Sequence, residues 1–216
     1  MPWLAWNYGK QDYPQRELVI VDSSRGDTAS FEDPTVTVVR CAPGSSIAHK
    51  RNLALQEARG SLVTWFDDDD WQHPRKLSIL DAALRDADAV AGSQHAWFVD
   101  LRRGRARRYD SRRMVLFTGS VFRREALAAD RFDEKRERAA DTAWLRSVIQ
   151  RSHREPRVVP ELVTWWLCHD RNISNPATRY AFPHAVADVR AMVDDADWGD
   201  TDLELDRLRG RVEHRR

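Results

Sequence analysis

Four consecutive aspartates, Asp67 to Asp70, follow directly on a short apolar run in this chain. The run from Leu62 to Phe66 holds aliphatic, β-branched and aromatic residues without polar alternation, a pattern typical of a strand buried on both faces. In an open α/β sheet, ligands bind outside the carboxyl ends of the strands. Adjacent carboxylates also repel one another, and a hard divalent cation such as Mg²⁺ or Mn²⁺ relieves that repulsion. We therefore expect the acid run, Asp67–Asp70, to border a ligand and metal site.

A second interpretation of the acid run is a solvated turn in which Asp70 caps the helix that begins near Pro74. Isolated acidic runs in proteins are more often turns of this kind. The apolar strand in front of the run and the helix behind it favour the ligand site here.

Apolar periodicity predicts strands that alternate with helices along most of the chain. Strands are expected at 17–22, 35–40, 62–66, 89–99, 115–122 and 157–168, and helices at 1–13, 46–58, 75–85, 138–151, 178–196 and from 200 onward. Such alternation indicates a mostly parallel, layered α/β sheet with flanking helices.

Composition excludes several classes of function. Among 216 residues, 35 Lys and Arg balance 34 Asp and Glu, so no overall field attracts nucleic acid, and the arginines from Arg102 to Arg108 lack interleaved aromatic residues for base stacking. Cys41 and Cys168 show no metal-ligand spacing and are expected to be reduced. No apolar segment reaches the roughly 20 residues of a membrane span, and no signal peptide is recognisable, so we expect a cytoplasmic protein.

The order of several motifs resembles that of family 2 glycosyltransferases of the GT-A fold. The motifs are QDYPQRELVIVDSSRGD, KRNLAL, GSLVTWFDDDDWQHPRKL, FTGSVFRREAL and AADTAWL, and the resemblance extends from about Asn7 to Asn175. It implies a Rossmann-like α/β domain over residues 1–176, followed by a C-terminal helical extension over residues 177–216. In the family, a nucleotide-diphosphate sugar lies across the carboxyl ends of the strands.

The resemblance also implies roles for residues near that nucleotide. Asp67 and Asp69 match the Asp-x-Asp motif that binds the ribose and a Mn²⁺ or Mg²⁺ ion on the diphosphate, and Asp68 can assist in nucleotide-sugar binding. Asp22 matches the acid that contacts the base or ribose. Arg51 matches a basic position that faces the nucleotide, although a solvated helix residue is an equal alternative.

The resemblance implies roles for residues farther along the chain as well. Asp141 matches the acid that removes the acceptor proton in inverting members of the family, and Ala140 stands where the family usually has Glu. Gly119 and Ser120 belong to a small Thr-Gly-Ser interruption of the expected strand 115–122, which would let a ligand, here the nucleotide sugar, approach the backbone, or they form a simple bulge. His169 matches a histidine that reaches the metal or diphosphate, and a surface histidine is the alternative.

The opening of the chain departs from the family pattern. Family members begin with a strand of the type apolar-apolar-apolar-Pro-Thr, whereas this sequence starts inside the helix that follows. The resemblance therefore implies an N-terminally truncated core, with the strand position between Glu17–Asp22 and Leu62–Phe66 lacking its usual occupant and with backbone groups left unpaired there.

Taken together, the sequence predicts an inverting, metal-dependent glycosyltransferase. The expected partners are a nucleotide-diphosphate sugar donor and an acceptor that is a glycan, a lipid or a small molecule, with no nucleic acid and with homo-oligomerisation left open. The alternative is a non-catalytic, degenerate binding module of the same fold, which the truncation and Ala140 favour. A nucleotidyltransferase would need a Gly-rich phosphate loop near the start of the chain, and the sequence contains none.

Overall fold

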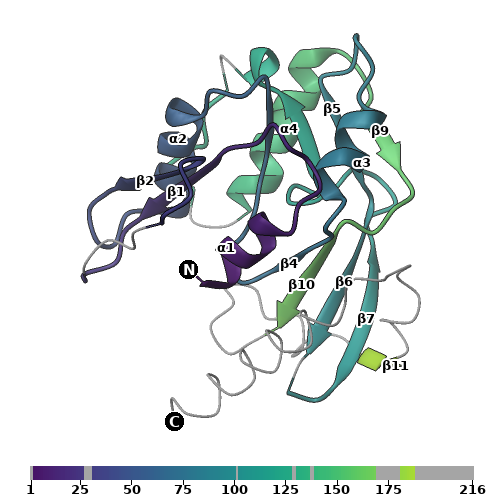
Figure 1. Ribbon diagram of the computed structural model, residues 1–216. Helices are drawn as coiled ribbons and strands as arrows, with labels where there is room; N and C mark the ends of the chain where they lie inside the picture. The colour runs from purple at the N-terminus through teal and green to yellow at the C-terminus, as the bar shows by residue number, and fades with distance from the viewer. Residues whose placement is uncertain are drawn as a thin grey trace.

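The computed structural model describes residues 2–26, 31–100, 102–127, 130–136, 139–168 and 181–187, which form a mixed α/β fold (Figure 1). The helices are α1 (Pro2–Gly9), α2 (Ile47–Glu57), α3 (Lys76–Ala83) and α4 (Ala140–Ser152), with a short 3₁₀ helix at Arg124–Leu127. The strands are β1 (Leu18–Asp22), β2 (Val36–Arg40), β3 (Leu62–Thr64), β4 (Trp71–Gln72), β5 (Val90–Ser93), β6 (His95–Asp100), β7 (Arg105–Asp110), β8 (Ser120–Arg123), β9 (Arg157–Val159), β10 (Thr164–Cys168) and β11 (His184–Ala185).

The described strands form three sheets. β1 and β2 make a parallel pair, a four-stranded sheet has the order β3-β8-β5-β9, and a five-stranded sheet has the order β11-β7-β6-β10-β4. Antiparallel pairings join β3 to β8, β8 to β5, β6 to β7, β10 to β4 and β7 to β11. The α/β class is as expected, but the sheets are mixed rather than mostly parallel.

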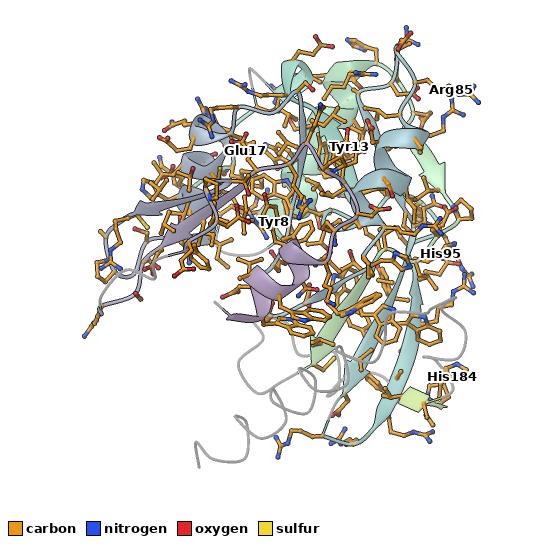
Figure 2. All side chains as sticks on the ribbon, in the orientation of Figure 1. Tyr8, Tyr13, Glu17, Arg85, His95 and His184 are labelled. Carbon is orange, nitrogen blue, oxygen red and sulfur yellow. The ribbon has the colours of Figure 1, made fainter. Side chains whose placement is uncertain are left out.

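The β1–β2 pair lies beside α2 and apart from the five-stranded sheet (Figure 1). Within the described residues β1 pairs only with β2, and β3 pairs only with β8. Glu17, labelled in Figure 2, links the residues just before β1 to those just before β3. Its carboxylate accepts hydrogen bonds from the backbone N–H groups of Arg59 (2.6 Å) and Gly60 (2.7 Å).

Two aromatic cores hold the larger sheets in place. The first packs Trp65, Phe117 and Phe122 against Trp144 of α4. The second packs tryptophans of β4, β6 and β10 beneath Trp3 of α1. The sequence explains both, because each of these strands places large apolar side chains on the face that meets a helix.

Two expected strands are each divided between sheets. The apolar stretch 89–99 becomes β5 and β6, and the stretch 157–168 becomes β9 and β10, so the chain passes twice from the four-stranded to the five-stranded sheet. Of the expected strand 115–122 only its end is β8. The segment Arg105–Asp110, where no strand was expected, is the strand β7.

The start of the expected C-terminal extension also differs from the prediction. Residues His184 and Ala185 form β11 on the edge of β7, and Val186 is buried in the second core, where a helix from residue 178 was expected. The rest of the predicted extension lies outside the described residues. No helix in the described part of the chain has the length and apolar character that crossing a bilayer requires.

Candidate functional site

The acid run is positioned by the strand and the core in front of it. β3 ends at Thr64, and Trp65 then turns into the first core, where its ring stacks on Phe117 at 5.3 Å and meets Trp144 edge to face at 6.1 Å. A buried aromatic anchor at this point fixes where the following carboxylates emerge. They stand at the carboxyl end of β3, as the sequence predicts.

The four aspartates occupy different environments. Asp68 is exposed, Asp69 is half-buried, and Asp67 keeps 40% of its side-chain surface exposed while it pairs with Arg51 at 3.4 Å. Asp70 is only 4% exposed, and its Oδ1 accepts a hydrogen bond from the backbone N–H of Leu167 in β10 at 3.2 Å. Asp70 therefore fastens the run to the five-stranded sheet and does not cap α3, whose N-cap residue is Arg75.

Carboxylates within the run oppose the ionisation of their neighbours. Burial, with the charges of Asp69 and Asp68, raises the pKa of Asp67, and the guanidinium of Arg51 opposes the rise. Burial and the charges of Asp67 and Asp69 raise the pKa of Asp70 well above its usual value. Neighbouring carboxylates thus make the ionisation of Asp67 and Asp70 harder, which is the situation that a bound cation relieves.

Lys76, which the sequence analysis did not single out, lies directly beneath the run. Its side chain is fully buried, and Nζ donates hydrogen bonds to the Trp65 carbonyl (2.8 Å), Gln72 Oε1 (2.8 Å) and the Thr118 carbonyl (2.7 Å). Burial lowers the pKa of Lys76 to about 7, and the charges of Asp67 and Asp70 oppose that change. The Lys76 ammonium group therefore links three segments: the residue after β3, strand β4 and the turn at Thr118.

Two further predicted residues come from N-terminal elements, Asp22 from β1 and Arg51 from α2, and of these Arg51 contacts the acid run. Asp22 ends β1, where its carboxylate accepts hydrogen bonds from Ser24 N (2.8 Å) and Arg40 Nη1 (2.8 Å). The Ser24 backbone bond contributes most to lowering the pKa of Asp22, and Arg40 adds to it, so this group is a carboxylate at neutral pH. Arg51 stands on α2 with its guanidinium 4.5 Å from the centre of the Phe117 ring, an arrangement that holds its charge toward Asp67.

Gly119 and Ser120 are buried within the protein. Ser120 is fully enclosed, and its hydroxyl donates a hydrogen bond to the Leu116 carbonyl at 2.6 Å. Its Oγ also lies against Gly92, where an added Cβ would come within 2.1 Å of that oxygen. Gly92 is thus the position where only a residue without a Cβ fits, whereas Ser120 stabilises the turn that contains Thr118.

Asp141 lies in the first turn of α4, half-buried, with Oδ1 accepting a hydrogen bond from Thr142 N at 2.7 Å. One turn later, Trp144 packs against Trp65, two residues before the acid run. Packing therefore brings the start of α4 toward the acid end of β3. Ala140 is the first residue of the helix, and His169 lies outside the described residues.

Within the described part of the chain, no group of three His, Cys, Asp or Glu side chains is arranged to hold a metal ion. The predicted ligands Asp67 and Asp69 nevertheless supply the carboxylate oxygens that Mg²⁺ and Mn²⁺ prefer, on a run of four adjacent acidic residues. Two protein carboxylates, with phosphate oxygens from a ligand, suit these ions better than a closed protein cage.

Comparison with known proteins gives a family match over most of this site. The sequence model described as Glycosyl transferase family 2 matches residues 7–150, which include Asp22, Arg51, the acid run and Asp141. A protein named as a colanic acid biosynthesis glycosyl transferase, WcaA of Escherichia coli K12, is 31% identical over 78 residues. That alignment covers 33% of this chain and 28% of WcaA.

Solved structures give the same fold at low sequence identity. TarS 1–349 of S. aureus in complex with UDP superposes with a TM-score of 0.56 and 16% identity, over 77% of this chain and 56% of that chain. A mannosyltransferase from Pyrobaculum calidifontis in complex with GDP-Man and Mn²⁺ has a TM-score of 0.57 and 18% identity, over 79% of this chain and 55% of its own. The chain thus spans a little over half the length of these structures, and the likeness is one of fold.

Proposed function

This chain belongs to glycosyl transferase family 2, and from that premise we propose that it moves a sugar from a nucleotide-diphosphate sugar to an acceptor hydroxyl or amine. The observation that carries the proposal is the acid run at the end of β3. Asp67 pairs with Arg51, Asp70 accepts a hydrogen bond from Leu167, and Lys76 bonds to the Trp65 carbonyl just before the run. The complexes of related fold with UDP and with GDP-Man support a donor of this class.

We assign donor binding to Asp22, Arg51, Asp67 and Asp68. Asp22 offers a buried carboxylate at the end of β1, suited to a ribose hydroxyl or a base N–H, and Arg51 offers a guanidinium suited to phosphate. Gly119 and Ser120 act indirectly in this proposal, because they are buried and brace the neighbouring turn.

Asp67 and Asp69 would hold a Mn²⁺ or Mg²⁺ ion, with His169 as a third ligand implied by the family resemblance. When bound, such an ion neutralises the negative charge that develops on the departing diphosphate. The protein's own contribution is to keep two carboxylates together at one strand end, despite their repulsion, through the anchoring of Asp70 and Lys76.

Asp141 serves as the general base in this proposal. The acceptor oxygen attacks the anomeric carbon, the bond from that carbon to the diphosphate breaks, and the acceptor proton passes to the Asp141 carboxylate. Attack from the face opposite the leaving group inverts the anomeric configuration. A carboxylate suffices because the hydroxyl becomes acidic only as attack proceeds.

The experiment that tests the function measures donor binding and transfer separately. Isothermal titration calorimetry with UDP and GDP, each with and without Mn²⁺, should show nucleotide binding that the metal strengthens, because the diphosphate completes the ion's ligand set. Asp69→Ala should abolish the metal-dependent part of the affinity. Asp86→Ala, which removes an exposed acid in the loop after α3, is the matched control and should leave that part intact.

Two results would change the assignment. Unaltered Mn²⁺-dependent affinity in Asp69→Ala would remove Asp69 from the metal site. Normal nucleotide binding without release of nucleoside diphosphate from any UDP- or GDP-sugar, across glycan, lipid and small-molecule acceptors, would favour the non-catalytic binding module, for which Ala140 in place of Glu is the motivating feature.

A further inference from the structure

Three aromatic side chains gather on one face of the five-stranded sheet. Phe98 of β6 lies 4.8 Å from Trp166 of β10 and 5.6 Å from Tyr109 of β7, and Tyr109 lies 5.5 Å from Trp166, each distance joining ring centres. We call these three residues the aromatic platform. All three are half-buried, so part of each ring is open to solvent.

The platform lies on the face of the sheet opposite the second core. Strand register pairs Trp166 with Phe98 and Phe98 with Arg107, so these side chains share one face. Their neighbours Trp165 and Trp97 point to the other face, where they are buried beneath α1. The platform rings are therefore not needed to close that core.

Hydrogen bonds connect the platform to the candidate site. Trp166 Nε1 donates to Thr118 Oγ1 at 2.9 Å, and the Thr118 carbonyl accepts from Lys76 Nζ, the group that also holds the Trp65 carbonyl before the acid run. The adjacent Phe117 packs 5.8 Å from Trp144, one turn beyond Asp141. Thr118 therefore contacts both Trp166 of the platform and Lys76 next to the acid run.

We propose that Phe98, Tyr109 and Trp166 form an acceptor subsite that stacks a pyranose ring of a glycan acceptor. The inference rests on the proposed transfer function and specifies its acceptor. The C–H bonds on one face of a pyranose carry partial positive charge, and the π-face of an aromatic ring carries partial negative charge, so the two attract while apolar surface is buried.

Polar groups at the rim of the platform favour a sugar over a lipid chain. Tyr109 brings a phenolic hydroxyl, for which the described residues provide no hydrogen-bond partner, and Arg107 stands beside Phe98 on the same face. Arg107 is held at this edge by a hydrogen bond to the Ala181 carbonyl. Polar groups around an apolar ring surface match a ligand with hydroxyls at its edge and C–H groups on its face, whereas an alkyl chain offers no hydrogen-bond partner to the Tyr109 hydroxyl.

The test uses saturation-transfer difference NMR on the intact protein with three probes, cellotetraose, chitotetraose and mannotetraose. At least one probe should receive saturation on the C–H protons of one pyranose face. Tyr109→Ala should weaken that binding about 3- to 10-fold, in line with the loss of one aromatic contact. Tyr109→Phe keeps the ring and should retain most of the saturation. Trp6→Leu, which removes a half-buried ring packed on Trp3 beneath the other face, is the matched control.

Donor binding separates this proposal from the function on which it rests. Calorimetry with UDP or GDP and Mn²⁺ should give the same affinity for Tyr109→Ala as for the unaltered protein. Absence of saturation for all three probes, or equal saturation in Tyr109→Ala, would overturn the glycan subsite even where nucleotide binding is normal. A concentration-dependent dimer that Tyr109→Ala dissolves would also overturn it, because the platform would then be a contact between two copies of this chain.

Discussion

Asp141 stands in the first turn of α4, where the helix dipole alone would favour an acid, so its role in the chemistry needs a direct test. Asp141→Asn keeps the shape of the side chain and the capacity of Oδ1 to accept the Thr142 N–H, but removes the base. Transfer should fall by about 10²-fold or more. Donor affinity, measured by calorimetry with nucleotide and Mn²⁺, should stay unchanged.

Equal losses of turnover and nucleotide affinity in Asp141→Asn would show that the residue supports the structure instead. Gln150→Ala, at the exposed end of the same helix, controls for general disturbance of α4 and should change neither quantity.

Lys76 gives the protein a pH dependence that can be isolated. Burial lowers its pKa from 10.5 to about 7 in the native state, against the opposing charges of Asp67 and Asp70. Between these two values the unfolded chain binds a proton at Lys76 that the native protein has lost, so the free energy of unfolding rises with pH through this window. Lys76→Met removes the titrating group and should lack that rise.

Urea unfolding of both proteins at pH 7 and pH 9.5 measures this effect. The free energy of unfolding of the unaltered protein, relative to Lys76→Met, should increase between the two pH values. Parallel behaviour of the two proteins would mean that the Lys76 ammonium keeps its ordinary pKa despite its burial.

At the residue scale, the position of the acid run was predictable from the sequence, but the different environments of its four aspartates were not. Four identical residues in a row do not indicate that Asp70 is buried and bonds to Leu167 while Asp68 is exposed to solvent. Lys76 looked like any polar residue at the start of a helix, because the oxygens it binds come from Trp65, Gln72 and Thr118, which only the fold brings together.

At the scale of elements, the contact between the starts of β1 and β3 depends on one side chain. Burial raises the pKa of Glu17, but the hydrogen bonds from Arg59 N and Gly60 N more than offset this, and the pKa is lowered overall. Glu17→Ala should destabilise the protein by about 1 kcal/mol and accelerate amide hydrogen exchange at Arg59 and Gly60. Glu57→Ala, an exposed acid at the end of α2, should do neither.

An unchanged exchange rate at Arg59 and Gly60 in Glu17→Ala would mean that water replaces the carboxylate without cost. The exchange measurement matters because these two residues are exposed, and a small change in global stability alone could arise elsewhere.

Helix and strand positions were largely predictable, whereas the division of strands between sheets was not. Ser46 caps α2 through the N–H of His49, at the start of the helix expected at 46–58, and α4 begins and ends within two residues of its expected bounds. The stretches 89–99 and 157–168 were each expected to be one strand because apolar residues occur throughout them. Hydrophobic periodicity does not indicate where a chain passes from one sheet to another. β7 was missed because arginines alternate along its exposed side.

At the scale of the whole molecule, the two larger sheets meet through buried polar groups. The Thr164 hydroxyl of β10 lies within hydrogen-bond distance of both Gln72 Oε1 (3.0 Å) and the Thr118 carbonyl (3.2 Å), and Lys76 Nζ donates to the same two oxygens. Such a network is stable only when each member has its partners, so it fixes how the sheets are placed relative to each other.

The acid run is fastened at both ends, to Lys76 through the Trp65 carbonyl and to β10 through Asp70. Its backbone is therefore preorganised before a donor arrives, and little conformational freedom is left to lose on binding. The cost of holding neighbouring like charges at one strand end is therefore met when the protein folds, rather than each time a donor binds.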